Sequence, residues 1–315
     1  MIKIGIVGAG SFAKTHANSI AKVPGCKITA VSSRTEAHAK EFAETYDCVY
    51  CTDYRDIHKI AEVDVVILNL PHNMHCEVGC YFLENKINVF VEKPMAMNVA
   101  ECDKMIKLAK ENGVSLVVGH VQQYTDAHKI LKKMIDDQEL GKLLRVTEVR
   151  DLHYFTPKRM GWHLKKETAG GGMFANFGAH SYDKLFYLTG ASLADVRSVC
   201  TNTINDFNVE EGAQVLGKLD NGVSFAFSYT GSEVPAHYET YFYFEKGVAK
   251  VLYSTELFVY KDGEWKQLTD DTYDMHDKAI VALVDHLEGR ESDITTAEHG
   301  RKVVEAIERT YENSL

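Results

Sequence analysis

The chain has 315 residues, of which 45% are hydrophobic and 25% charged, and its 45 acidic and 35 basic residues give a formal net charge of −10. This length predicts about two domains with a sizeable core. The acidic balance disfavours nucleic acid and anionic membrane surfaces as partners, and no apolar run reaches the roughly 18 residues that a membrane-spanning helix needs. Because the first strand pattern begins at residue 2 with no leader pattern ahead of it, we expect a cytoplasmic protein, and its seven cysteines to be reduced thiols.

Five apolar runs rich in Val and Ile alternate with helical patterns in the first part of the chain. The runs cover residues 2–7, 27–31, 64–68, 87–91 and 114–118, and the helical patterns cover residues 11–23, 35–46, 73–85 and 99–111. This alternation predicts an α/β fold with a doubly wound parallel sheet of the Rossmann type. Because parallel strands point the same way, their carboxyl ends share one edge, where such sheets bind ligands.

The pattern changes after residue 120. A helix is predicted at 126–138, a strand at 143–152 and a helix at about 173–188, and from residue 196 alternating apolar and polar residues predict a mainly antiparallel sheet. Two helices, at about 273–288 and 296–312, close the chain. We therefore predict a dinucleotide-binding domain over residues 1–120 and an α+β substrate domain over 121–315. We expect helices to cover one face of the C-terminal sheet and the other face to be open. Such an open face suggests a partner surface, so we predict a homo-oligomer, a dimer or tetramer, formed through this sheet.

A glycine-containing turn follows the first strand and opens the first helix. Gly8 permits the tight turn, Gly10 lets a pyrophosphate approach the backbone, and the helix N-terminus faces that anion. Alone this spacing is a weak signal, but its place in a series of alternating units indicates a dinucleotide site. Its predicted residues are Gly8, Gly10, Ser11, Phe12 and Ala13, the last where a small residue lets the helix pack on the strand.

The end of the second strand indicates which dinucleotide is bound. NAD enzymes usually carry an acidic residue there, about 20 residues after the glycines, whereas this chain has Ser33 and Arg34. Because a guanidinium offers paired donors to phosphate oxygens, we predict NADP in preference to NAD; the alternative is a solvated loop arginine. Further cofactor contacts are predicted from the same edge at Leu70, Pro71, His72, His75, Glu92, Lys93 and Gln122.

Glu92 and Lys93 follow the strand at 87–91, and Pro94 follows them at a position where an X-Pro bond can be cis. A charged pair at the end of a buried strand is costly unless it is used or paired. An ammonium beside a nicotinamide at this edge can polarise a carbonyl or share a proton with a hydroxyl. We therefore predict a catalytic role for Lys93, the alternative being a surface lysine.

Three glycines precede the helix at 173–188, and they leave room for a ligand or for close backbone packing. Asn176, His180, Asp183 and Tyr187 share one face of that helix. A histidine there can move a substrate hydroxyl proton at neutral pH, although a lone histidine is more often structural. Tyr154, Trp162 and His163 in the preceding loop are candidate substrate contacts, with a lid or an oligomer contact as alternatives.

No resident metal is predicted. Cys48 and Cys51 have half of a zinc spacing, but no second pair lies at ligand distance in the sequence, so we interpret them as incidental thiols. His72, His75 and Cys76 could be mistaken for metal ligands, but their place at the cofactor edge favours nicotinamide or substrate contact.

Three motifs in order resemble the Gfo/Idh/MocA oxidoreductase family: the glycine turn, residues 71–75 and Glu92-Lys93-Pro94. The glycine-led helix from residue 170 to Asp183 agrees, so the resemblance covers nearly the whole chain. The resemblance implies a Rossmann domain followed by an open-faced α+β domain. It makes Lys93 the family's lysine and His180 its catalytic histidine, with Asp183 orienting the imidazole or binding substrate. The family often has Asp where this chain has Asn176, which can only orient or hydrogen-bond.

The resemblance implies NAD(P)-dependent hydride transfer on a hydroxyl or carbonyl carbon of a sugar, polyol or related small molecule. Lys93 would polarise the oxygen, His180 would relay its proton, and the two side chains would serve one bound nicotinamide. One rival is a non-catalytic dinucleotide-binding regulator of the same fold, since fold does not dictate function. Another keeps the enzyme but changes the substrate, for example to a dihydrodiol or an imine.

Overall fold

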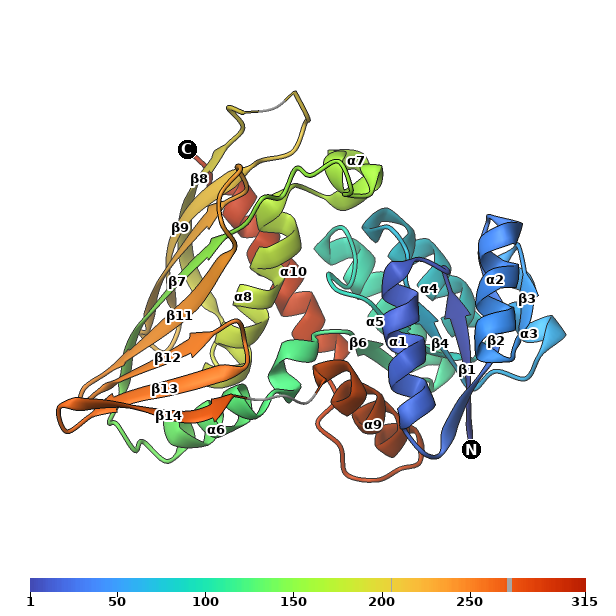
Figure 1. The fold of residues 1–315 in the computed structure, drawn as a ribbon, viewed down its shortest axis with the longest axis horizontal. Helices are drawn as coiled ribbons and strands as arrows, with labels where there is room; N and C mark the ends of the chain where they lie inside the picture. The colour runs from blue at the N-terminus through green and yellow to red at the C-terminus, as the bar shows by residue number, and fades with distance from the viewer. Residues whose placement is uncertain (205, 271–273) are drawn as a thin grey trace. The chain divides into compact units, whose positions relative to one another are not determined.

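The computed structural model describes residues 1–204, 206–270 and 274–315. The chain forms two compact units, one of Met1–Val121 with Asp274–Val304 and the other of Gln122–Tyr273 with Glu305–Leu315. Each unit contains one sheet (Figure 1). The sequence placed residues 274–304 in the second domain, whereas the structure packs them in the first unit. The division at residue 120 as a domain boundary stays a prediction.

The first unit holds a six-stranded sheet in the order β3-β2-β1-β4-β5-β6, with every pair parallel. The strands are β1 (Ile2–Val7), β2 (Cys26–Ser32), β3 (Val49–Cys51), β4 (Val65–Leu68), β5 (Asn88–Val91) and β6 (Leu116–Val118). The predicted doubly wound parallel sheet is confirmed, with all five predicted strands. The sequence missed β3, because a three-residue, largely exposed edge strand gives no apolar run.

Helices cover both faces of this sheet. They are α1 (Ser11–Lys22), α2 (Glu36–Tyr46), α3 (Ile57–Ile60), α4 (His75–Glu84), α5 (Val99–Asn112) and α9 (Met275–Leu287), with 3-10 turns η1 (Tyr54–Asp56) and η2 (His72–Met74). α5 begins where the Asn98 side chain accepts the Glu101 N–H at 2.9 Å, and it ends at Gly113, whose φ is +66°. Tyr273, where the sequence placed the start of the penultimate helix, lies outside the described residues.

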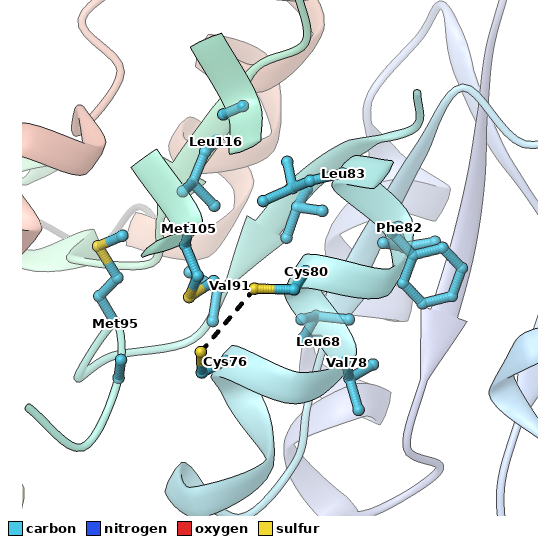
Figure 2. Packing of buried hydrophobic residues seen from close by; sticks show 14 of the residues in the cluster. Leu68, Cys76, Val78, Cys80, Phe82, Leu83, Val91, Met95, Met105 and Leu116 are labelled. Carbon is cyan, nitrogen blue, oxygen red and sulfur yellow. Dashed lines mark hydrogen bonds between the residues drawn. The ribbon is translucent and has the colours of Figure 1, made fainter. Parts of the chain in front are cut away.

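Two apolar clusters lie on opposite faces of the sheet. Figure 2 shows part of the one in which α4 and α5 pack, whose members include Leu68, Val78, Phe82, Val91 and Met105. The other packs α1 and α2 on the strands, and Ile280, Leu283 and Val284 of α9 belong to it. The closing segment therefore completes the core of the first unit, a long-range contact with no local sequence signal.

The second unit holds an eight-stranded sheet in the order β14-β13-β12-β11-β7-β10-β9-β8. Its strands are β7 (Leu143–Asp151), β8 (Leu193–Thr201), β9 (Gly212–Leu219), β10 (Ser224–Thr230), β11 (His237–Phe244), β12 (Val248–Leu252), β13 (Glu256–Lys261) and β14 (Glu264–Asp270). All neighbours are antiparallel except β7 and β10, so the predicted mainly antiparallel α+β arrangement is confirmed.

One face of the second sheet carries helices and the other is open. Figure 1 shows α8 (Met173–Thr189) along the covered face, with α6 (Asp126–Asp136) beside it. The predicted alternation holds, since Phe225, Phe227 and Tyr229 are buried beneath the helices. The remaining elements are η3 (Val121–Tyr124), η4 (Gly161–Leu164), α7 (Lys166–Ala169) and α10 (Ala297–Glu312), which begins in the first unit and ends in the second. None of the described helices is long and apolar enough to cross a membrane.

The packing of α9 in the core of the first unit predicts that substitutions at two of its residues will change the free energy of unfolding by different amounts. Leu283 is 1% exposed and Val281 is 43% exposed. Leu283→Ala removes buried methyl groups, so it should lower the free energy of unfolding by about 2–5 kcal/mol. Val281→Ala on the same helix should change it by about 0.5 kcal/mol or less. Urea unfolding of both variants measures this, and equal effects would place α9 outside the core.

Candidate active site

The turn after β1 has the geometry that the glycines predicted. Gly8 has φ +93°, and a Cβ there would lie 2.3 Å from the Asn69 carbonyl oxygen, so only glycine fits. Ala13, two residues into α1, is fully buried, as expected for close packing of helix on strand. The fold itself therefore requires Gly8 and a small residue at 13.

Packing does not require a glycine at position 10. No described atom lies within 4 Å of a Cβ built on it, and its backbone has φ −76° and ψ −178°, which any residue can adopt. The first turn of α1 carries no acidic residue and receives no side-chain cap from the described residues. Its amides thus form a ready anion site, and these residues fit the pyrophosphate of a dinucleotide.

The edge of β2 presents the predicted nucleotide-selecting residues. Ser33 donates its N–H to the Cys51 carbonyl at 3.2 Å, which fixes the loop against the unpredicted strand β3. Arg34 is exposed and forms no ion pair with any residue that the structure describes. Glu36 lies two positions further on, where its carboxylate accepts from the Tyr50 hydroxyl at 3.5 Å.

His75 joins the loops that follow β4 and β5. Its fully buried ring lies between two carbonyls, with Nε2 3.0 Å from the Leu70 oxygen and Nδ1 2.9 Å from the Pro94 oxygen. Burial lowers the pKa of His75, although both carbonyls oppose the shift. The Lys93–Pro94 peptide bond is cis, in agreement with the sequence. His75 therefore supports the shape of the loop that bears Lys93, while cofactor contact by it and by the buried His72 stays a prediction.

Glu92 has a partner that the sequence did not reveal. It is 8% exposed, and its Oε1 lies 2.7 Å from Nε2 of His16, a fully buried residue of α1. Burial raises the pKa of the Glu92 carboxyl, but His16, Lys93 and His276 outweigh it, so the net shift is downward and the group is ionised at neutral pH. Lys93 itself is half-buried. A direct cofactor contact by Glu92 stays a prediction.

In the second unit, two of the three glycines before α8 serve close packing. A Cβ on Gly172 would lie 2.1 Å from the Glu210 carbonyl oxygen, and one on Gly171 would lie 2.1 Å from the Tyr311 hydroxyl. The Glu210 carboxylate accepts the N–H groups of Gly172 and Phe174, each at 2.8 Å, and the Tyr311 hydroxyl at 2.9 Å. The N-terminus of α8 is thus occupied by a carboxylate of the chain itself. Of the two interpretations that the glycines allowed, the structure shows packing.

The candidate residues of α8 differ in exposure. His180 is half-buried, Asn176 is 8% exposed and Asp183 is fully buried. Tyr154 is also fully buried; burial raises its pKa to about 12 against the opposing effects of Arg159 and Asn176, so Asn176 lies close to its phenol. Direct substrate contact by Tyr154 and Asp183 stays a prediction, and their burial indicates support of the α8 face.

The loop before α7 places Trp162 and His163 together. Their rings stack with centroids 3.6 Å apart and an interplanar angle of 25°, and both are half-buried. Gln122 belongs to the second unit, where the Tyr238 hydroxyl donates to its Oε1 at 3.4 Å. The structure thus puts the expected cofactor residue Gln122 in the unit that holds the expected substrate residues.

A buried ion pair lies beside the His180 face and was missed by the sequence. Lys184 of α8 and Glu148 of β7 are 2% and 1% exposed, and the ammonium donates to the carboxylate, to Thr240 Oγ1 at 2.6 Å and to the Tyr238 hydroxyl at 2.9 Å. Ser181 also donates to Glu148. The one sequence signal that could have indicated the burial of Ser181 and Lys184 is the spacing of the apolar residues along α8. No group of three or more candidate metal ligands occurs in the described parts of the chain, and the seven cysteines are free thiols.

The fold and the glycine turn define a protein with an NAD-binding Rossmann fold. Residues 2–120 match the sequence model described as "Oxidoreductase family, NAD-binding Rossmann fold", and residues 128–250 match the "GFO/IDH/MocA C-terminal domain". The chain belongs to the Gfo/Idh/MocA oxidoreductase family, as its motifs indicated.

Relatives with curated names share between a quarter and a third of their residues with this chain. It is 28% identical over 216 residues to the 2,7-anhydro-N-acetylneuraminate hydratase of Mediterraneibacter gnavus, covering 69% of this chain and 55% of that protein. It is 28% identical over 200 residues to the myo-inositol 2-dehydrogenase of Thermotoga maritima, covering 62% and 57%. These matches span little more than half the length of either relative.

Solved structures share the fold over the whole chain. The aldose–aldose oxidoreductase of Caulobacter crescentus, solved with glycerol, superposes with a TM-score of 0.89 over 99% of this chain and 97% of that one, at 22% identity. At this identity the likeness establishes the fold alone.

The contrast between the two glycines of the turn gives a matched pair of substitutions. Gly8→Ala forces a left-handed backbone and a clash, so it should cost about 1–3 kcal/mol of stability. Gly10→Ala should leave the melting temperature close to that of the wild type but weaken dinucleotide binding, because the new methyl group lies over the α1 amides. Thermal melting and fluorescence titration with NAD and NADP measure both effects. Unchanged affinity in Gly10→Ala would show that no dinucleotide approaches this turn.

Proposed function

We propose that this chain is an oxidoreductase that transfers hydride between a nicotinamide dinucleotide and a hydroxyl or carbonyl carbon of a sugar, polyol or related small molecule. The observation that carries the proposal is the edge of the first sheet. There Gly8, at a positive φ that favours glycine, and the uncovered Gly10 lead into the uncapped N-terminus of α1, and Lys93 follows β5 at the same edge. Membership of the Gfo/Idh/MocA family supports the reaction class.

The names of the relatives support the substrate class. One is a polyol dehydrogenase, one an aldose oxidoreductase, and one a hydratase of a sugar derivative. A small polyhydroxylated molecule is common to all three names, whereas the reaction is not. The proposal of redox chemistry therefore rests on the residues of this chain and not on the name of the hydratase relative.

The cofactor residues are assigned by their chemistry. The α1 amides after Gly10 would hold the pyrophosphate, and Ser33 with Arg34 would hold a 2′-phosphate, which makes NADP the proposed cofactor in preference to NAD. Arg34 suits this role because it is exposed and has no ion-pair partner in the described part of the chain. When bound, the nicotinamide supplies or accepts the hydride.

The chain's own residues handle the oxygen and its proton. In the oxidative direction, the His180 imidazole would accept the hydroxyl proton of the carbinol that gives up the hydride. The Lys93 ammonium donates a hydrogen bond to the same oxygen and stabilises its developing charge. Both side chains are half-buried, so each has surface to offer a substrate. Asn176, a neutral amide, orients the substrate or its neighbours and carries no proton.

The open face of the second sheet supports a homo-oligomer. A pocket on this face is lined by Thr147, Val199 and Leu216, and the last two are 41% and 65% exposed. Apolar side chains in such a patch are characteristic of a protein interface. We assign this face to a second copy of the chain, in a dimer or tetramer, and the protein to the cytoplasm.

Lys93→Ala tests the function. It should lower kcat about 100-fold or more, because the oxygen loses its acid partner, while the Kd for the dinucleotide stays within about threefold. The control is Lys107→Ala, which removes a lysine that pairs with Glu111 on the surface of α5. Steady-state assays that follow the reduced dinucleotide at 340 nm, with a panel of sugars and polyols, give kcat. Fluorescence titration gives the Kd for the dinucleotide. Unchanged kcat in Lys93→Ala refutes the assignment, and a wild type that binds dinucleotide without turning over any substrate favours the regulator.

Arg34→Ala tests the cofactor preference. Loss of a charge-assisted contact to a 2′-phosphate should raise the Kd for NADP about 10- to 100-fold and leave the Kd for NAD nearly unchanged. Arg55→Ala is the matched control, because this neighbouring arginine is already paired with Asp53 at 2.6 Å. Parallel titrations with the two dinucleotides measure the ratio. A wild type that binds NAD more tightly than NADP would overturn the preference without touching the reaction.

A further inference from the structure

We propose that His16 is a positioning residue for Lys93 and acts through the carboxylate of Glu92. The inference rests on the role proposed above for Lys93. It assigns a function to a fully buried histidine that lies neither in the glycine turn nor in the Glu-Lys-Pro motif.

Hydrogen bonds connect His16 to the Lys93 backbone in two steps. His16 Nε2 lies 2.7 Å from Glu92 Oε1, and because a carboxylate only accepts, Nε2 carries the proton. The other oxygen, Glu92 Oε2, accepts the backbone N–H of Lys93 at 3.3 Å. The path therefore runs from α1, the helix that begins at the glycine turn, to the backbone of the proposed catalytic residue.

The surroundings fix Glu92 in this arrangement. The backbone N–H of Glu92 donates to the Leu68 carbonyl at 3.3 Å, which continues the sheet one residue beyond β5. On the other side, a Cβ on Gly119 would lie 2.9 Å from Glu92 Oε1, so the glycine after β6 leaves the space that the carboxylate occupies. Few other orientations of the side chain are open to it.

The His16 ring is equally enclosed. Phe12, Phe90 and His276 meet it edge-on at centroid distances of 5.3, 5.5 and 6.0 Å. His16 Nδ1 is buried and makes no hydrogen bond to a described residue, so Glu92 is the polar partner that orients the ring. His276 is held in turn by Asp274, 2.7 Å from its Nδ1. The ring cannot turn away without breaking an aromatic cluster.

The buried negative charge of Glu92 requires a hydrogen-bond donor, and His16 supplies one. A buried carboxylate without a partner is strongly destabilising, so it moves toward another donor or takes a proton when its partner is removed. Either response changes the acceptor that holds the Lys93 N–H. Because a displacement of about 1 Å at a reacting group can cost about 100-fold in rate, the effect should reach turnover even though His16 touches no substrate.

Variants of His16 test this coupling against simple structural damage. His16→Ala removes the donor and should lower kcat about 10- to 100-fold, whereas His16→Gln keeps an amide donor at the Nε2 position and should recover most of the loss. The dinucleotide Kd should stay within about threefold in both. His58→Ala is the control, since His58 also packs on aromatic rings of the first unit, at 5.8 Å from Tyr81, but its Nδ1 makes no hydrogen bond to a described residue. It should lower stability without changing kcat.

A double-mutant cycle separates action through Lys93 from independent action. If His16 works through Lys93, adding His16→Ala to Lys93→Ala should reduce kcat no further. Multiplied losses, or a raised dinucleotide Kd with normal kcat, would overturn the inference and make His16 a packing or cofactor residue. A normal kcat in Lys93→Ala would instead refute the proposed function, so the two failures are distinguishable.

A spectroscopic measurement needs no substrate. Reductive methylation with 13C-formaldehyde labels the lysine amines, and the Lys93 signal is the one absent from Lys93→Arg. Its chemical shift should move in His16→Ala, return toward the wild-type value in His16→Gln and stay unchanged in His58→Ala. A Lys93 signal indifferent to His16→Ala would overturn the inference even if all variants fold.

Discussion

The common direction of the strands in the first sheet is the constraint on which the candidate site depends. Val7, Leu68, Val91 and Val118 are paired across β1, β4, β5 and β6. The pairing continues one residue further, since the N–H groups of Asn69, Glu92 and Gly119 donate to the carbonyls of Val7, Leu68 and Val91 at 2.8–3.3 Å. Gly8, Asn69, Glu92 and Gly119 therefore form one row across four strands. The sheet ladder, rather than any loop, sets the position of Glu92 and hence of the backbone that precedes Lys93.

The helices α1 and α8 both follow glycines, but their N-terminal amides have different partners. Both N-termini concentrate unpaired amides that attract a negative charge. At α8 the chain supplies the charge itself, because the Glu210 carboxylate accepts amides of Gly172 and Phe174. At α1 the first turn has neither an acidic residue nor a side-chain cap among the described residues. Similar glycine signals in a sequence thus mark an internally satisfied helix start in one unit and a candidate ligand site in the other.

The sequence was sufficient for the fold class because local patterns determine it. Apolar runs and the Gly8 turn are short-range signals, and each appears in the structure where it was predicted. The short edge strand β3, the return of α9 to the first core and the partner of Glu92 were not predictable in this way. His16 and Glu92 are 76 residues apart, and nothing in the spacing of either shows that the two side chains meet. The site residues that the sequence named are positioned by partners that it could not name.

Three buried carboxylates share one structural task. Glu92, Glu148 and Glu210 are at most 8% exposed, and each has donors that offset its burial. Glu92 accepts the Lys93 N–H, and Glu210 accepts amides at the start of the helix that bears Asn176. Glu148 pairs with Lys184 and accepts from Ser181, both of which follow His180 in α8 within about one turn. In each case the acceptor holds backbone or helix next to a residue proposed to act on substrate. Removing such a carboxylate would leave its donors unsatisfied, so these positions tolerate change less than exposed charges do. These three interior charges thus fix the elements proposed to carry the chemistry, a role that needs burial and geometry rather than contact with substrate.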